Sequence, residues 1–276
     1  MANVINTNVK SIMAQNAMSV NNRSLEKAMQ QLSTGKRING ASDDAAGLAI
    51  SEKMTGQIRG LNQAVRNAND GISMMQTAEG ALVETTNMLQ RMRELAVQSA
   101  NGSLDTTQRG YLNDEYKALS NEIDNIAQST TWNGMKILNG SVATVTYQVG
   151  ANTGTGNTAT VEFKSMAIGA SGMSVGSIGG STASNALAAI SSLDTALDTV
   201  ASQRSAMGAS INQLTYAADN LANVSMNTSA SRSRILDTDY AQTTTELARS
   251  QIIAQAATAM LAQANQQPQS VLSLLK

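Results

Sequence analysis

Both ends of this chain are almost free of charged side chains. Residues 1–22 carry one charge, on Lys10, and residues 250–275 carry none. Both segments have helical periodicity, and a helix on the surface of a globular protein normally keeps a charged face for water. Here that face consists of Gln, Asn, Ser and Ala. The two ends together supply only part of the cover that such helices need, so we expect partners, most simply copies of the same chain, to bury them.

Composition excludes most catalytic chemistry. The chain has no Cys and no His, so a disulfide, a thiolate nucleophile, a Cys/His metal site or an imidazole base is impossible. Asp43, Asp44 and Glu52 lie close in sequence, but we interpret them as residues that cap a helix or suit its dipole rather than as an acid–base pair. We therefore expect no enzyme activity, no cofactor and no catalytic or metal site.

Charge and hydropathy exclude two further classes. A net charge of −1 gives no electrostatic case for binding nucleic acid or acidic membranes. No run of about 18 apolar residues is present, and Gln255 and Thr258 interrupt the most apolar interval, 252–261. The first residues have neither a basic region nor an unbroken apolar run, so they do not form a Sec signal peptide. We expect no membrane insertion.

The fold is predicted to be mainly α. Aromatic residues make up 3% of the chain and Pro268 is the single proline, so the core consists of Leu, Ile, Val, Met and Ala in long helices. We predict a long antiparallel coiled coil or helix bundle formed by the N- and C-terminal segments, with a small β-hairpin region near the middle of the chain. Outside the terminal segments, the helices are placed at about 43–99, 104–129 and 186–236.

Hydrophobic periodicity defines the predicted helix seams. Steps of three and four continue for about 50 residues from Ala186, the pattern of a coiled coil. This seam comprises Ile190, Leu193, Leu197, Val200, Arg204, Met207, Ile211, Leu214, Ala218 and Leu221. Two further stripes are Met75, Leu82, Leu89, Met92 and Ala96, and Leu112, Tyr116, Leu119, Ile123 and Ile126.

The terminal segments carry matching stripes that we expect to face each other. The first comprises Ile5, Val9, Ile12, Met13, Val20, Leu25, Met29 and Leu32. The second comprises Leu236, Tyr240, Leu247, Ile253, Ala257, Met260, Leu261, Ala264, Val271, Leu272, Leu274 and Leu275.

A different pattern occupies the middle of the chain. Residues 142–149 and 158–163 alternate between apolar and polar, and a Gly/Asn/Thr-rich turn at 152–157 separates them. This pattern predicts a β-hairpin within about 142–164. Residues 165–185 are rich in Gly, Ser and Ala and are predicted to form a polar loop. Ser and Thr residues of 141–185 are candidate glycan carriers, although the simpler interpretation is a plain surface loop.

Residues 33–61 combine a turn with a helix start. Gly35, Asn39 and Gly40 suit the turn, and Ser42 or Asp43 suits the helix N-cap. This stretch closely resembles bacterial flagellin, as do residues 70–82, 90–98, 131–134 and 261–275. The resemblance covers residues 1–164 and 186–276. Where many flagellins insert large variable outer domains, this chain has about twenty residues, so it resembles a minimal flagellin with the helical core domains only.

The resemblance implies a structural role. The chain would self-assemble into the helical filament of the bacterial flagellum, the extracellular propeller for motility, after type III export without a cleaved Sec signal. Residues 1–40 with 237–276 would form the inner terminal coiled-coil domain, and 41–236 the outer core domain. Its partners would be itself, an export chaperone, the filament cap and hook-junction proteins. We expect subunit packing through Ile5, Val9, Ile12, Ala45, Ala46, Leu48, Ile253, Met260, Leu261, Val271, Leu272, Leu274 and Leu275.

The resemblance also implies recognition by innate immune receptors. In flagellins sensed by Toll-like receptor 5, a set of Arg, Glu and Leu side chains forms the contact. The matching residues here are Gln90, Arg91, Glu94, Leu95 and Glu115. From the residues alone, an ordinary solvated helix face is the simpler interpretation of Arg91, Arg93 and Glu94.

Two other functions remain open at this stage. A hook–filament junction protein shares the terminal coiled coil but does not form long polymers, so filament length separates it from flagellin. A secreted helical adhesin would bind a receptor and would not need its terminal helices for polymerisation.

Because isolated helices are marginal in water, we expect the terminal helices of a filament subunit to order only on assembly.

Overall fold

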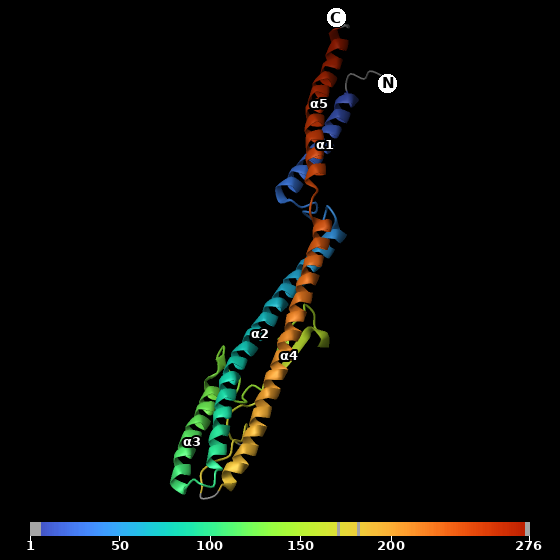
Figure 1. Cartoon of the computed structure of the whole chain (residues 1–276). Helices are drawn as coiled ribbons and strands as arrows, with labels where there is room; N and C mark the ends of the chain where they lie inside the picture. The colour runs from blue at the N-terminus through green and yellow to red at the C-terminus, as the bar shows by residue number, and fades with distance from the viewer. Residues whose placement is uncertain (1–6, 170–171, 181–182, 274–276) are drawn as a thin grey trace. The chain divides into compact units, whose positions relative to one another are not determined.

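The computed structural model describes residues 7–169, 172–180 and 183–273, with residues 155 and 267–273 described by their backbone alone. In this part of the chain the structure is mainly helical, and two small antiparallel sheets lie near the middle (Figure 1). The predicted fold class is therefore confirmed. No helix of the described part is both long and apolar enough to cross a membrane. The helices are α1 (Val9–Thr34), α2 (Ala45–Ser99), α3 (Thr106–Ser129), α4 (Ser184–Leu236) and α5 (Tyr240–Ser273).

The chain forms two compact units. The first comprises residues 1–56 and 227–276, and the second comprises residues 57–226. The long helices α2 and α4 each contribute to both units. The junctions near 40 and 237, where the sequence placed its domain boundaries, are the turns between α1 and α2 and between α4 and α5, and both turns belong to the first unit.

In the first unit, α1 and α5 pair as antiparallel helices (Figure 1). Asn8 caps the N-terminus of α1 by accepting a hydrogen bond from the backbone N–H of Ser11 at 3.2 Å. Gly35 ends the helix in the left-handed conformation, with φ of 69°. That conformation favours glycine, which has no Cβ to collide with the backbone.

The two turns of the first unit are joined by backbone hydrogen bonds. Lys36 and Asp237 form an isolated antiparallel bridge. The Arg37 N–H donates to the Leu236 carbonyl at 2.7 Å, and the Arg37 guanidinium donates to the Ile235 carbonyl at 2.6 Å. Carbonyls at a helix end lack hydrogen-bond donors within the helix, and at the end of α4 Arg37 provides these donors.

The capping residue of α2 differs from the prediction. Asp44, rather than Ser42 or Asp43, accepts the N–H of Gly47, at 2.8 Å. Asp43 faces back into the turn, where its carboxylate accepts the N–H of Asn39 at 3.1 Å. The correction has a simple cause, because Asp43 is needed to close the turn and the helix begins one residue later.

In the second unit, α2 lies beside both α3 and α4 (Figure 1). The five stripe residues predicted on α2 are all fully buried, so that stripe is confirmed. On α3, Tyr116 and Ile123 are buried as predicted, whereas Leu112, Leu119 and Ile126 are half-buried at the margin of the core. The helix starts with a capping box in which Asp105 and Gln108 each accept the other's backbone N–H.

The buried stripe of α4 is offset from the predicted seam. Leu193, Val200, Met207, Leu214 and Ala218 are buried as predicted. Other predicted seam positions are only half-buried, and at three of them the residue one position earlier is buried instead, twice a small Ala that allows close packing. The half-buried positions are Ile190, Leu197, Arg204, Ile211 and Leu221, and the buried residues beside the first three are Ala189, Ala196 and Gln203.

Two hairpins follow α3. The predicted one consists of β3 (Thr144–Gln148) and β4 (Thr158–Glu162), paired in antiparallel register with Val145 opposite Val161. The other, β1 (Thr131–Trp132) with β2 (Met135–Lys136), was not predicted. Asn133 and Gly134 form its two-residue turn with φ of 48° and 79°. An Asn-Gly pair is the preferred sequence for such a turn, so the signal was present in the sequence.

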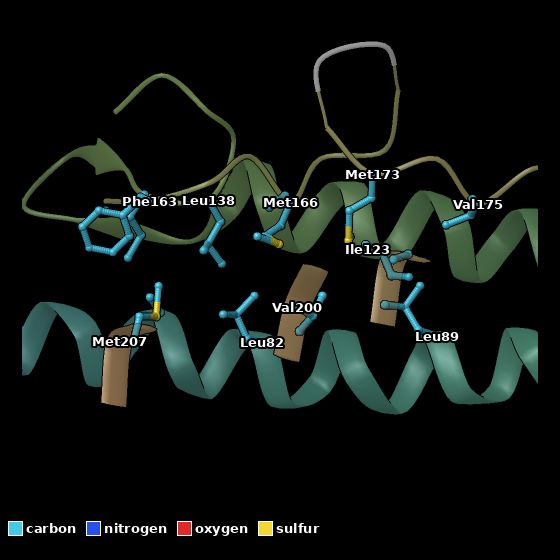
Figure 2. Close-up of a cluster of buried hydrophobic side chains, with 14 of the residues drawn as sticks. Leu82, Leu89, Ile123, Leu138, Phe163, Met166, Met173, Val175, Val200 and Met207 are labelled. Atoms are coloured by element: carbon cyan, nitrogen blue, oxygen red, sulfur yellow. The ribbon is translucent and has the colours of Figure 1, made fainter. Parts of the chain in front are cut away.

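The segment after β4 contradicts the prediction of a polar surface loop. We call residues 163–169 and 172–180 the strap. It has neither helix nor strand, yet its apolar side chains lie in the core between α2, α3 and α4 (Figure 2). Their burial was not predicted because Gly, Ser and Ala separate them without helical or strand periodicity. The buried strap residues are Phe163, Met166, Met173, Val175 and Ile178.

Buried polar side chains hold this irregular backbone in place. The Tyr116 hydroxyl donates to the carbonyl of Val175, and the buried Ser99 hydroxyl donates to the carbonyl of Ile178 at 3.1 Å. Carbonyls without a partner in a core are costly, so these bonds make the close packing of the strap feasible. Burial raises the pKa of Tyr116 to about 12.

Candidate self-association surface

The seam between α1 and α5 is built from small and polar residues. Buried and half-buried positions recur at alternating steps of three and four on both helices, the spacing of a coiled coil. Several of these positions carry Ser, Thr, Asn or Ala rather than large apolar side chains. The seam comprises Ser11, Ala14, Met18, Asn21, Leu25, Ala28 and Leu32 on α1, and Thr243, Leu247, Ser250, Ala254, Ala257, Leu261 and Ala264 on α5.

Two asparagines fix the register of this pair. The Asn8 amide donates to the Ala264 carbonyl at 2.8 Å, and the buried Asn21 amide donates to the Ser250 carbonyl at 2.8 Å. A buried amide that needs its partner disfavours other registers.

Most of the large apolar side chains of these helices point away from the seam. Of the residues predicted to pack between subunits, Val9, Ile12, Ile253 and Met260 are 50%, 49%, 45% and 65% exposed. Neighbouring Met13, Val20 and Ile252 are exposed as well. The prediction that the two terminal stripes face each other is therefore wrong for these residues and correct for Leu25, Leu32, Leu247, Ala257, Leu261 and Ala264.

We call the exposed set the outward apolar face. Residues seven apart lie on the same side of a helix, which places Met13 with Val20 on α1 and Ile253 with Met260 on α5. This seven-residue spacing is the sequence signal that identifies Met13 and Val20, which the predicted packing set omitted. Large exposed apolar patches mark interaction sites in soluble proteins. The outward apolar face comprises Val9, Ile12, Met13, Val20, Ile252, Ile253 and Met260.

The other predicted packing residues have different settings. Ala45 and Ala46 are exposed on the first turn of α2, and Leu48 is half-buried where it lines a shallow hollow with Leu236. Leu261 is half-buried in the seam. Val271 and Leu272 lie in α5, of which only the backbone is described there, and Ile5, Leu274 and Leu275 lie outside the described residues.

The acidic residues near the start of α2 have structural partners. Besides the N–H of Asn39, the Asp43 carboxylate pairs with the Lys27 ammonium at 3.1 Å. These interactions hold the pKa of Asp43 below its ordinary value, with the hydrogen bond from Asn39 the largest cause. Among the described residues, no group of three or more Asp and Glu side chains is arranged to hold a metal ion.

The predicted receptor residues form a second surface on α2 and α3. Gln90, Arg91, Glu94 and Glu115 are all exposed. Arg91 pairs with Glu94 and with Glu115, at 2.9 Å in both cases, and these carboxylates raise the pKa of Arg91, with Glu94 the largest cause. Leu95 is 1% exposed. It packs in the core and is not accessible to a receptor in this fold, which corrects its place in the predicted contact.

Comparison with known proteins identifies the family. A family model described as the bacterial flagellin N-terminal helical region matches residues 5–143, and one described as the C-terminal helical region matches residues 190–275. The chain belongs to the bacterial flagellin family. The interval between the two matches holds β3, β4 and the strap, so both matched regions of this flagellin are mainly helical.

Individual relatives agree over their full lengths. Flagellin of Halalkalibacterium halodurans is 47% identical over 273 residues, covering 99% of this chain and 100% of that protein. Flagellin of Bacillus subtilis is 42% identical over 306 residues, covering 99% of each protein. The flagellar filament 33 kDa core protein of Treponema phagedenis is 43% identical over 289 residues, covering 99% of this chain and 100% of that protein.

Proposed function

We propose that this flagellin is the structural subunit of an extracellular bacterial flagellar filament. The proposal rests on the different side chains that α1 and α5 place in their seam and on their outer side. The seam within the chain uses mainly small and polar residues, whereas the outward apolar face leaves large side chains uncovered. Burial of such side chains is the main favourable term in protein association. Neighbouring subunits supply the cover.

The polymer follows from the repetition of one contact. Identical contacts that do not close into a ring generate a helical filament. Residues 1–40 with 237–276 form the inner domain beside the central channel, and 41–236 form the outer core domain. The chain acts mechanically, as part of a propeller, and carries out no reaction. An export chaperone binds the subunit before assembly, and the filament cap and hook-junction proteins contact it at the two ends of the filament. Type III export delivers the subunit without Sec cleavage.

Assembly also orders the terminal helices. The α1–α5 pair holds few large apolar side chains in its seam, and ordering a residue costs about 1–2 kcal/mol in backbone entropy. Burial of the outward apolar face in the filament offsets that cost. In dilute free protein, amides of 9–30 and 245–265 should exchange much faster than those of 70–98. Equally slow exchange in both regions would contradict this coupling of order to assembly.

Seeded elongation tests the proposal. Purified full-length protein should extend filament seeds into micrometre fibres, and a chain lacking residues 250–276 should not, although the core unit at 57–226 keeps its circular dichroism and thermal unfolding. Elongation by the truncated chain would show that the C-terminal helix is dispensable, as expected for an adhesin. Assembly that stops at short polymers would favour a hook–filament junction protein.

We further propose that the free subunit binds Toll-like receptor 5 through the exposed cluster of Gln90, Arg91, Glu94 and Glu115. The paired carboxylates on two helices hold the Arg91 guanidinium in one place. Arg91→Asp should abolish receptor signalling by the monomer. Arg93→Asp is a matched control, because Arg93 is equally charged and exposed but pairs with Asp194 of α4, at 2.8 Å. Undiminished signalling by Arg91→Asp would refute the proposal.

A further inference from the structure

The methionines that the structure describes differ widely in their exposure to solvent. Six of them, including Met75 and Met92, are at most 3% exposed and fill the core of the second unit. On the terminal helices, by contrast, Met13, Met29 and Met260 are 67%, 55% and 65% exposed, and of these Met13 and Met260 belong to the outward apolar face. A thioether in contact with water is open to oxidation, whereas a buried one is shielded.

The register of the coiled coil brings the thioethers of Met13 and Met260 to one position along the pair. Residue 8 lies level with residue 264, and residue 21 lies level with residue 250. In an antiparallel pair this places Met13 at the level of Met260. A change in polarity at this level therefore affects both helices of the face at once.

We propose that Met13 and Met260 are oxidation sites that control assembly of the free subunit. This proposal rests on the function proposed above. The oxidant is a peroxide or hypochlorite. With hydrogen peroxide, the sulfur attacks one peroxide oxygen, the O–O bond breaks, an S–O bond forms, and water leaves. The sulfur loses two electrons and the peroxide gains them, so the step is balanced.

The sulfoxide changes the face in two ways. An apolar, flexible side chain becomes polar and chiral. Burial of that polar group between subunits without a hydrogen-bond partner raises the critical concentration for elongation roughly tenfold for each oxidised residue. In the filament the same side chains are covered, so assembly protects them. Methionine sulfoxide reductases reverse the change, which makes the modification a reversible block on subunits that have not yet assembled.

Limited peroxide treatment of the full-length monomer tests the proposal. Sulfoxides are located by peptide mass spectrometry, and the critical concentration for seeded elongation is measured by sedimentation. Treated wild type should show sulfoxide at residues 13 and 260 and a critical concentration raised at least about tenfold. The double variant Met13→Leu/Met260→Leu should elongate normally after the same treatment. Met226→Leu is the control, because Met226 is 63% exposed but lies in the second unit, and this variant should remain sensitive.

A second measurement requires no variant. Oxidation rates of Met13 and Met260 are compared between free subunits and preformed filaments, and we expect at least about tenfold protection in the filament. Equal rates in the two states would overturn the proposal, as would an unchanged critical concentration after full oxidation of both residues. Failure of untreated protein to elongate seeds would instead count against the proposed filament function.

Discussion

Ile253 provides a quantitative test of the outward apolar face. It leaves 45% of its surface exposed. That fraction corresponds to roughly 90 Å², and at about 25 cal/mol per Å² its burial between subunits is worth about 2 kcal/mol. Ile253→Gln removes this contribution while keeping a residue that favours helix. A loss of about 2 kcal/mol corresponds to a critical concentration raised roughly thirtyfold.

The assay is seeded elongation of the full-length chain, with unpolymerised protein measured after sedimentation. Ile253→Leu is the matched control, because it keeps the apolar area and the helix propensity and should stay close to wild type. The critical concentration of Ile253→Gln should exceed that of Ile253→Leu by the same large factor at several temperatures. A difference below about twofold would show that this side chain is not buried between subunits.

Three further predictions concern packing in other parts of the fold. Ile178→Ala should lower the free energy of unfolding in urea by about 2–5 kcal/mol, because the strap is part of the core. Ser174→Ala, at an exposed position of the strap, should change it by less than about 0.5 kcal/mol. Equally small effects of both substitutions would mean that the strap is a surface loop. Burial raises the pKa of Tyr116 to about 12, so as the pH rises the unfolded chain releases this proton before the folded chain does. The free energy of unfolding of the wild type should therefore fall by up to roughly 3 kcal/mol between about pH 10 and 12. Tyr116→Phe should lack that alkaline loss in pH-dependent urea titrations, and identical titration curves would refute the assignment. Gly47→Ala should destabilise the start of α2 by about 1 kcal/mol or more in thermal unfolding. The new Cβ would lie 2.4 Å from the Asp44 carboxylate that caps the helix. An unchanged melting temperature would contradict this clash.

The buried stripe of α2 in the second unit could be predicted because periodicity and burial agree on this helix. Leu82 and Leu89 repeat at seven residues on a helix whose one side is covered, so the apolar stripe and the buried stripe coincide. The strap could not be predicted in this way. Its buried side chains follow no period, since its backbone is fixed by donors such as Tyr116 and Ser99 that lie far away in the sequence.

The terminal helices show why an apolar stripe does not identify its partner. The sequence places Val9, Ile12 and Met260 on helical stripes, and these stripes exist, but the pattern cannot say whether the other half of the contact lies in the same chain or in another. Ser11 and Asn21 also recur at seam spacing, and their polarity conceals the seam from a search for apolar residues alone. The candidate surface was therefore predicted from its low charge, whereas the direction in which each side chain points required the structure.

The distribution of residue size across the α1–α5 pair determines how folding and assembly are coupled. Replacement of a buried Leu by Ala typically costs about 2–5 kcal/mol, so a seam with Ala and Ser at many positions holds much less free energy than one of Leu throughout. The asparagine pairing at Asn21 adds register specificity but little net stability, because the amide gives up hydrogen bonds to water. If Ile12, Ile253 and Met260 occupied the seam instead, the pair would be stable alone and the lattice would gain little from covering it. With these residues on the outside, the same side chains that leave the free pair weak become the source of free energy for subunit addition. A subunit of this kind remains easy to unfold before assembly and becomes rigid only where neighbours cover it.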